Sequence, residues 1–321
     1  MWRYGKSWFQ LAQITASYGL FRQKKVHHFP YRLWIEPTNR CNLACVMCPN
    51  DGFKKEDLGN MDWDLYTSLI DQAAGRVHDV NLHHRGEPTL HPKLPEMIRY
   101  AHENKVRTKL HTNGTTLTAD LAEAILDSGL ELLSISFDGY TAETYEKIRV
   151  RANFDRTLKQ IHYLLDLRKQ RGQTKPKIVM EVMEFEAFDP VVKKQFIADL
   201  KRRGLDRMII KKPHNWAGNV ELNTFESQDF SPCTFPWHAM VVLWDGKVGS
   251  CPHDFFAKIH YGDANTDSLE TIFNSEPIQT LRSQMLGNAL SGLTEPCSSC
   301  DSVRRKRMAG IPLASLKYIR E

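Results

Sequence analysis

Seven cysteines fall into two groups along the 321-residue sequence. The first group has the pattern Cys-x-x-x-Cys-x-x-Cys and consists of Cys41, Cys45 and Cys48. The second group consists of Cys233, Cys251, Cys297 and Cys300. Cysteine thiolates hold iron–sulfur clusters, normally four to a cubane. Three thiolates would leave one iron open for chemistry, whereas four would make a closed centre suited to electron transfer or to holding structure. The spacing therefore predicts one open and one closed metal centre.

The composition argues for metal-bound cysteines over disulfides. The N-terminal 30 residues contain several basic residues, no uninterrupted apolar core and no small-residue cleavage site. No run approaches the roughly 18–20 apolar residues that cross a bilayer. We therefore expect a cytoplasmic protein with reduced thiols and no stable membrane association. The formal net charge of +5 permits an anionic substrate and gives no indication of nucleic acid.

The middle of the chain alternates short apolar strands with amphipathic helices, which is typical of a parallel sheet with crossover helices. Strands are expected at residues 31–36, 77–84, 107–112, 132–137, 178–185 and 207–211. Helices are expected at residues 60–76, 94–103 and 154–170, after a Thr118 cap up to Gly129, and from Asp189-Pro190 to Gly204. Six such units instead of eight predict a partial (β/α)6 barrel of the TIM type.

The pattern changes after residue 218. A hairpin is expected from Met240–Trp244 and Lys247–Ser250, with Asp245-Gly246 as its turn, followed by short helices near residues 267–268 and 276–285. We predict three parts: a helical N-terminal extension (1–30), the barrel (31–218), and a small C-terminal α+β domain with a basic tail (219–321). The four later cysteines suit a domain too small to hold itself together without a metal centre.

Polar residues occur at the ends of the predicted barrel strands, which is where a parallel barrel carries its functional groups. They are Arg85-Gly86-Glu87-Pro88, His111-Thr-Asn113-Gly, Ser134, Ser136, Asp138, Glu181, and Lys211-Lys212. Inward polar side chains in buried strands are costly unless they are used. Their order, one set at each strand end, predicts a single polar mouth that includes the three-cysteine loop.

Taken together, these motifs resemble the radical SAM superfamily, in which a [4Fe–4S] cluster binds S-adenosylmethionine (SAM) at its open iron. Cys41, Cys45 and Cys48 match the CxxxCxxC motif, and Gly86, Glu87 and Pro88 match the GEP motif. The resemblance implies that the GEP segment holds the methionine amino group. It further implies that Ser136 and Arg149 contact the methionyl carboxylate or ribose, and that Asn113 lines the SAM pocket.

The C-terminal cysteines resemble the SPASM/twitch extension of the same superfamily. A full SPASM domain has more cysteines and binds two auxiliary clusters, whereas four cysteines fit the single-cluster twitch form. The spacing is similar to that of twitch-type aminocyclitol and sugar dehydrogenases. The resemblance thus implies two [4Fe–4S] clusters, one that binds SAM and one auxiliary, together with a flavodoxin- or ferredoxin-type electron donor.

The cysteine inventory favours oxidation. If all seven cysteines are ligands, no thiol remains to return a hydrogen atom to a substrate radical. We expect a 5′-deoxyadenosyl radical to abstract a C–H hydrogen, a base to take a proton and the auxiliary cluster to accept an electron, which turns a carbinol into a ketone. Arg149, Glu181 and Lys212 are candidate catalytic residues, and His83 and His111 are further candidate bases.

The substrate class rests on the short segment before the first strand. About 30 residues precede it, too few for a peptide-recognition domain. We therefore expect a small polar substrate such as a sugar, aminocyclitol or nucleoside. Three alternatives stay open: a peptide-modifying maturase, a redox-neutral sugar epimerase or decarboxylase, and a non-enzymatic zinc-binding module.

Overall fold

The computed structural model describes residues 2–185, 188–221, 230–287, 289–304, 307–308 and 311–312. The chain divides into two compact units. The core unit consists of Ile35–Gly75 and Asp79–Pro213, and the terminal unit consists of Met1–Trp34, Arg76–His78 and His214–Glu321. The domain boundaries expected at residues 30/31 and 218/219 stay a prediction.

The core unit contains a parallel sheet whose strands hydrogen-bond in the order β6-β5-β4-β3-β2. The strands are β2 (Asp79–Leu82), β3 (Thr108–Thr112), β4 (Leu132–Ser136), β5 (Lys177–Met183) and β6 (Arg207–Lys211). Helices α2 (Trp63–Ala73), α3 (Leu94–Glu103), α4 (Ala119–Asp127), α5 (Ala142–Ile148), α6 (Phe154–Gln170) and α7 (Pro190–Arg203) follow the strands. The alternation of strands and helices predicted for this region is confirmed.

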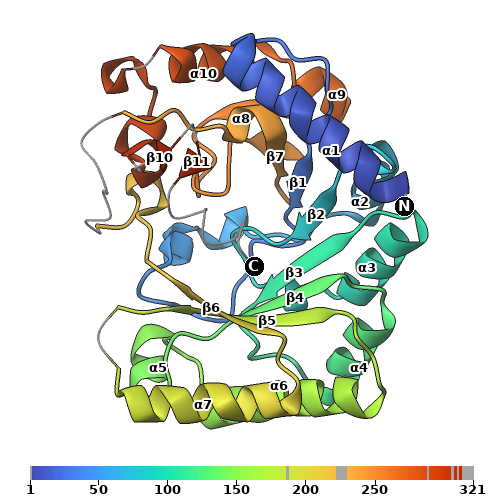
Figure 1. Ribbon diagram of the computed structural model, residues 1–321, viewed down its shortest axis with the longest axis vertical. Coiled ribbons are helices and arrows are strands. Elements are labelled where there is room, and N and C mark those ends of the chain that lie inside the picture. The colour runs from blue at the N-terminus through green and yellow to red at the C-terminus, as the bar shows by residue number, and fades with distance from the viewer. Residues whose placement is uncertain are drawn as a thin grey trace. The chain divides into compact units, whose positions relative to one another are not determined.

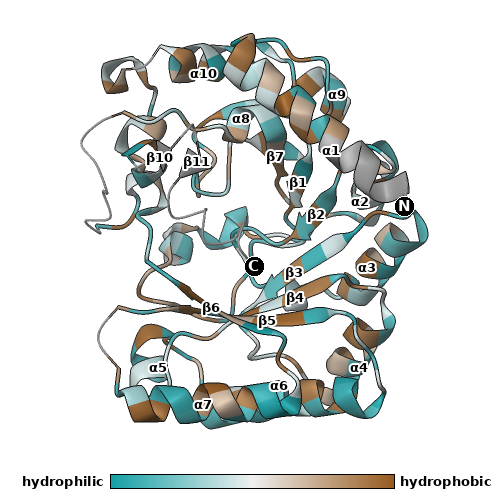
Figure 2. Cartoon of the chain, viewed as in Figure 1, coloured by the Kyte–Doolittle hydropathy of each residue, from teal (hydrophilic) through white to brown (hydrophobic). Residues whose placement is uncertain are grey.

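Helices α2, α3, α4 and α6 of the core unit each bury several apolar residues, whereas α7 buries only Leu200 among its described residues. Helices α4, α6 and α7 lie along one side of β4 to β6, and α6 carries hydrophilic residues among its hydrophobic ones (Figures 1 and 2). Ile125 of α4 and Ile161 of α6 are fully buried, as is Ile135 of β4. Burying side chains of this size contributes about 1.5–3 kcal/mol each to folding. The core of the unit therefore lies between the sheet and these helices.

Local capping sets the helix ends that the sequence predicted. Thr118 accepts a hydrogen bond from Leu121 N at the start of α4, and Asp189 accepts from Val191 N and Val192 N at the start of α7. Gly204 ends α7 in a left-handed conformation, with φ 107°. The bounds predicted for α3, α6 and β6 match those of the structure.

The terminal unit combines residues from both ends of the chain. It contains α1 (Trp2–Thr15), the π-helical turn η1 (Ala16–Leu20) and most of β1 (Arg32–Ile35) from the first part of the sequence. Later residues supply an antiparallel β7-β8-β9 meander. These later elements are α8 (Phe235–His238), β7 (Ala239–Val242), β8 (Lys247–Gly249), β9 (His260–Asp263), α9 (Leu269–Ile272) and α10 (Glu276–Leu286). The last short strands, β10 (Arg307–Met308) and β11 (Ile311–Pro312), pair with each other.

The hairpin predicted in the C-terminal region is confirmed as β7 and β8, and its Gly246 has φ 90°. Strand β9 and helix α8 were not predicted. Both elements have four residues, too few for a periodic hydrophobic pattern to distinguish them from loop.

Buried polar contacts tie the N-terminal residues of the terminal unit to its C-terminal residues. Trp237 Nε1 donates to Gln23 O over 2.8 Å, and Asn274 Nδ2 donates to Val26 O over 3.0 Å. The fully buried Arg282 donates to Lys24 O over 2.7 Å. Residues 23–26 therefore belong to the framework that carries the second cysteine group.

Within the described residues, no helix has both the length and the hydrophobicity that crossing a membrane requires. The cytoplasmic location stays a prediction.

Candidate functional site

The three cysteines of the first group lie on one loop of the core unit, between β1 and the 3-10 helix η2 (Pro49–Gly52). All seven cysteines of the chain are free thiols. Burial raises the pKa of Cys41 to about 11 and that of Cys48 to about 12, and neighbouring thiols act in the same direction. Because metal binding needs thiolates, an iron centre would relieve the cost of this arrangement.

Neither cysteine group is as compact as the ligand set of a single metal ion. Sulfurs on one tetrahedral zinc, with Zn–S bonds of ~2.3 Å, lie about 3.8 Å apart. Among the described residues, only His253, Cys300 and Asp301 bring three candidate ligand atoms within 4.8 Å of one another. Neither cysteine group is that compact, although the thiols of each group influence one another electrostatically.

Hydrogen bonds to the segment after α5 hold the first cysteine loop. Ala44 N donates to Val150 O and Val46 N donates to Ile148 O, both over 3.1 Å. Arg149 lies between the acceptors Ile148 and Val150, and its guanidinium hydrogen-bonds to Cys45. This contact lowers the pKa of the Cys45 thiol, whereas burial, the larger effect, raises it. Arg149 thus favours a thiolate at Cys45.

A buried aspartate also binds Arg149. Arg149 Nε donates to Asp138 Oδ2 over 2.9 Å, and Asp138 Oδ1 accepts from Met183 N over 2.6 Å. The structure therefore places Arg149 between Asp138, which follows β4, and the cysteine loop. Its predicted contact with SAM stays a prediction.

The Gly86-Glu87-Pro88 segment packs tightly against the residues that precede Cys41. A Cβ atom on Gly86 would lie 2.3 Å from Thr38 O and 2.6 Å from Arg40 O, so only glycine fits there. Glu87 N donates to Arg40 O over 2.8 Å. This close approach fixes the motif relative to the cysteine loop.

The carboxylate of Glu87 connects the motif to β3. It accepts from Thr112 Oγ1 over 2.7 Å, from Asn113 N over 2.6 Å and from Thr89 N over 3.1 Å. Burial raises the pKa of Glu87, and these donors offset part of the cost of its charge. In the structure the side chain of Glu87 positions Asn113, the residue expected to line the SAM pocket.

Sequence reasoning missed Asn42, which links the cysteine loop to Asn113. Asn113 Nδ2 donates to Asn42 Oδ1 over 3.0 Å. Asn42 Nδ2 donates to Thr115 Oγ1 over 2.8 Å, and Thr115 Oγ1 donates back to Asn113 Oδ1 over 2.7 Å. The position of Asn42 directly after Cys41 was its only sequence signal.

A second missed pair is the buried Glu36 and Arg85. Arg85 Nε donates to Glu36 Oε1 over 2.7 Å, and Arg85 Nη2 donates to Glu36 Oε2 over 2.6 Å. The side chain of Glu36 is 0% exposed and that of Arg85 is 7% exposed. This bidentate pair joins the segment after β1 to the residue before Gly86.

Inward-facing residues of four strand ends form a charged cluster, which we call the barrel cluster: His83, His111, Glu181 and Lys211. Lys211 Nζ contacts Glu181 Oε2, and His111 Nδ1 lies 3.9 Å from the same oxygen. The rings of His83 and His111 are 4.0 Å apart. Burial holds the pKa of His83 well below its usual range, so this imidazole is neutral.

The lysine that reaches Glu181 is Lys211, whereas the candidate Lys212 is exposed. Lys211 is the last residue of β6 and Lys212 follows the strand, and the sequence did not reveal which of the two reaches Glu181. Ser136 of β4 is half-buried and pairs in register with Glu181. Within the described residues, Ser134 Oγ and His83 Nδ1 are buried without a hydrogen-bond partner.

The second cysteine group comes together in the terminal unit. Cys233 precedes α8, Cys251 follows β8, and Cys297 and Cys300 lie on the 3-10 helix η7 (Cys297–Ser299) and at its end. Burial raises the pKa of Cys251 well above its usual value, and the Cys300 and Cys233 thiols raise it further. Four converging thiols in this environment fit the ligand set of an iron–sulfur cluster.

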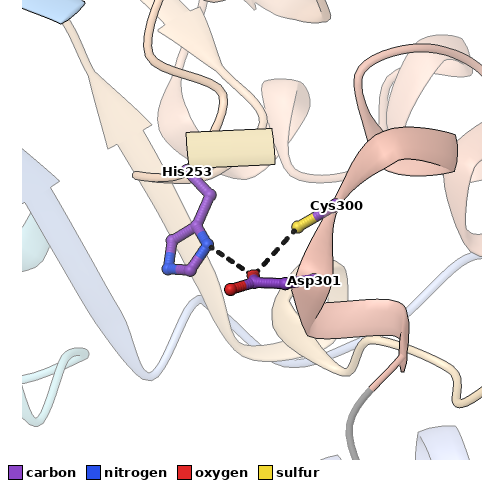
Figure 3. Close-up of side chains that lie close together, drawn as sticks. All are labelled: His253, Cys300 and Asp301. Carbon is purple, nitrogen blue, oxygen red and sulfur yellow. Dashed lines mark hydrogen bonds and ion pairs between the residues drawn. The ribbon is translucent and has the colours of Figure 1, made fainter. Parts of the chain in front are cut away.

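Two further side chains adjoin Cys300, and neither was predicted. The Asp301 carboxylate lies between the His253 ring and the Cys300 sulfur (Figure 3). Asp301 Oδ1 is 3.9 Å from Cys300 Sγ, and His253 Nδ1 is 3.8 Å from Asp301 Oδ1. The surroundings of Cys300 are therefore polar and charged as well as sulfur-rich.

Comparison with known proteins places both cysteine groups in domains of one superfamily. The family model of the radical SAM superfamily matches residues 35–180, and the model of an iron–sulfur cluster-binding domain, SPASM, matches residues 233–301. A protein of Pyrococcus furiosus that modifies the cofactor of a tungsten-containing aldehyde ferredoxin oxidoreductase is 32% identical over 260 residues, which cover 68% of this chain and 70% of that protein. This chain belongs to the radical SAM superfamily. The resemblance seen in the sequence is confirmed, and SAM, a SAM-binding [4Fe–4S] cluster and auxiliary iron–sulfur chemistry come with it.

Other curated relatives match over a smaller region. The AdoMet-dependent heme synthase of Methanosarcina barkeri is 35% identical over 130 residues, 40% of this chain and 37% of that enzyme. The mycofactocin maturase MftC of Mycobacterium tuberculosis is 34% identical over 136 residues, 42% of this chain and 34% of that enzyme. The chain thus spans little more than a third of the length of either relative.

Two solved structures share the fold. BtrN in complex with AdoMet and 2-DOIA has a TM-score of 0.57 at 17% identity, with 86% of this chain and 93% of BtrN covered. Streptococcus suis SuiB bound to its precursor peptide SuiA has a TM-score of 0.66 at 14% identity, with 92% of this chain and 73% of SuiB covered. The predicted radical SAM core with a smaller C-terminal α+β domain is confirmed.

Proposed function

We propose that this radical SAM enzyme is a dehydrogenase that oxidises a carbinol of a small polar molecule such as a sugar, aminocyclitol or nucleoside. The observation that carries the proposal is the barrel cluster, where Glu181 contacts Lys211 and lies 3.9 Å from His111. Oxidation of a carbinol requires a group that takes the hydroxyl proton, and a carboxylate beside an imidazole can do so.

The residues of the chain would divide the work of binding the cofactors. Cys41, Cys45 and Cys48 would hold the cluster that binds SAM, with Gly86, Glu87, Pro88, Asn113, Ser136 and Arg149 around SAM. Cys233, Cys251, Cys297 and Cys300 would hold one auxiliary cluster, which is the twitch arrangement. When bound, SAM and its cluster supply the radical that removes a hydrogen atom from carbon.

Within this scheme, the barrel cluster handles the proton. Loss of the C–H hydrogen leaves a carbon radical that still bears a hydroxyl group. Glu181 or His111 would take the hydroxyl proton as the carbinol becomes a ketone. A cluster held by Cys233, Cys251, Cys297 and Cys300 would supply the acceptor for the remaining electron. Lys211 stabilises the Glu181 carboxylate, and the neutral His83 packs against His111 without adding charge.

The cysteine count supports oxidation over hydrogen return. With all seven cysteines assigned as ligands, no thiol is left to give a hydrogen atom back to the substrate radical. The electron donor that starts the cycle would be of the flavodoxin or ferredoxin type.

Anaerobic incubation with SAM, dithionite and sugars or aminocyclitols deuterated at the carbinol carbon tests the proposal. We expect deuterium in 5′-deoxyadenosine and an equimolar ketone. Formation of 5′-deoxyadenosine with deuterium but without any two-electron-oxidised product would contradict dehydrogenation and favour a redox-neutral reaction.

A second candidate function is peptide modification. It is favoured by the fold shared with SuiB bound to a precursor peptide and by the sequence similarity to mycofactocin maturases. A short precursor peptide encoded beside the gene, and a mass change of that peptide upon incubation with the enzyme and SAM, would favour it over oxidation of a free small molecule.

A further inference from the structure

Residues 215–218, which follow β6 in the chain, contact the loop that carries Cys297 and Cys300. Asn215 Nδ2 donates to Ser299 O over 2.9 Å, and Asp301 N donates to Asn215 Oδ1 over 3.3 Å. Asn215 is only 4% exposed. One buried amide therefore binds the backbone on both sides of Cys300.

The backbone around Asn215 is built for this approach. Trp216 and Ala217 have φ values of 48° and 52°, a left-handed conformation that is unfavourable for a non-glycine residue. A Cβ atom on Gly218 would lie 2.8 Å from Ser299 Cβ. Such conformations persist only where the surroundings enforce them. The contact between this segment and the cysteine loop is thus a specific one.

A backbone N–H that follows this loop donates a hydrogen bond to the sulfur of Cys300, a predicted cluster ligand. Ser302 N donates to Cys300 Sγ over 3.4 Å, and Ser302 lies in the 3-10 helix η8 (Asp301–Arg304) that follows. Cys300 is only 6% exposed and Asp301 only 1%, so the donor and the nearby carboxylate both act in a region with little water to screen them.

Hydrogen bonds to the sulfurs and nearby charges set the reduction potential of iron–sulfur clusters. An N–H donor stabilises the more negative, reduced state and so raises the potential, whereas a buried carboxylate acts in the opposite direction. We propose that Asn215 is a positioning residue that fixes the Ser302 N–H on Cys300 Sγ and thereby raises the potential of the auxiliary cluster, making it a better acceptor of the substrate electron. This inference rests on the proposed oxidation and on the proposed ligand set.

The test is a redox titration of the anaerobic holoenzyme followed by EPR, using the signal that does not change on addition of SAM. Ser302→Pro removes the N–H, and Pro is tolerated in a first helical turn. Ser302→Ala keeps the N–H and is the matched control. Asn215→Ala leaves the Ser302 N–H in place but removes the two hydrogen bonds of Asn215 that position it. We expect a lower potential in the Ser302→Pro and Asn215→Ala variants, and an unchanged potential in Ser302→Ala.

A wild-type potential in either the Ser302→Pro or the Asn215→Ala variant, with iron and sulfide content retained, would overturn the proposal. Loss of iron from both, with Ser302→Ala intact, would also overturn it, because the contacts would then serve cluster assembly instead of its potential. Asp301→Asn gives an independent check, with an expected shift to higher potential. No substrate is present, so a shift would stand even if the enzyme oxidises nothing.

Discussion

Two groups of side chains in the core unit matter at the scale of single residues: those that hold the cysteine loop, and those that surround Glu181 in the barrel cluster. Arg149 lies beside Cys45, where its positive charge favours a thiolate, and is itself held by Asp138. Glu181 lies between His111 and Lys211, so a proton from the substrate could be accepted by the Glu181 carboxylate or by the His111 ring. In the proposed function, the first arrangement would favour metal binding and the second would accept a proton.

Replacement of Glu181 by Gln tests the proton acceptor. The amide cannot take the proton, so we expect product formation to fall by 10²-fold or more, in the range typical of a lost general base. Cleavage of SAM in the absence of substrate should continue, because Glu181 is not among the predicted SAM contacts. Product and 5′-deoxyadenosine are both measured by chromatography. Glu123→Gln, at an exposed ion pair with Arg171, is the matched control; equal losses in the two variants would contradict the role.

At the scale of elements, the strand ends and the cysteine loop are joined by buried contacts that no single element could make. Gly86 approaches the backbone of residues 38–40, Glu36 binds Arg85, and Asn42 binds Asn113. Each contact joins the cysteine loop or its approach to the end of a neighbouring strand. The geometry of the SAM-binding region therefore depends on these connections.

Gly86→Ala should disturb this region through its backbone. The new Cβ would meet Thr38 O at 2.3 Å, and overpacking of this kind costs about 1–3 kcal/mol. We expect a lower melting temperature and weaker SAM binding, measured by thermal unfolding and by equilibrium dialysis. Gly292→Ala, where nothing lies within 4 Å, should change neither. Wild-type SAM affinity in Gly86→Ala would contradict the idea that the close contact between Gly86 and residues 38–40 is needed for SAM binding.

The Glu36–Arg85 pair allows a double-mutant cycle. Arg85→Met leaves a buried carboxylate without its guanidinium, and breaking a buried pair costs about 3–5 kcal/mol. We expect the Glu36→Leu/Arg85→Met double variant to regain part of that loss in denaturant unfolding. Additive destabilisation by the two changes would mean that the pair is not coupled.

Local signals were enough to predict most elements. The cap Asp189 and the stop at Gly204 gave the bounds of α7, and the periodic apolar pattern gave those of α3, α6 and β6. Contacts between distant residues were not predictable, because nothing near Asn215 in the sequence indicates Ser299 as its partner. The choice of Lys211 over Lys212 likewise depends on strand pairing, which fixes the inward face of β6.

At the scale of the whole molecule, two compact units each hold one cysteine group. The terminal unit takes residues from both ends of the chain, and Trp237 donates to the carbonyl of Gln23 and Arg282 to that of Lys24. The division of the cysteines into a group of three and a group of four thus corresponds to two separately built sites. The proposed reaction assigns radical formation to the first site and electron acceptance to the second.

The most direct test of this assignment is the ratio of oxidised product to 5′-deoxyadenosine in the Cys297→Ala variant. Removing one ligand of the auxiliary centre should leave SAM cleavage at the first site intact but remove the electron acceptor. We predict equimolar product and 5′-deoxyadenosine in the wild-type enzyme, and 5′-deoxyadenosine with almost no oxidised product in the variant. An unchanged ratio in the variant, with the auxiliary iron lost, would contradict the account.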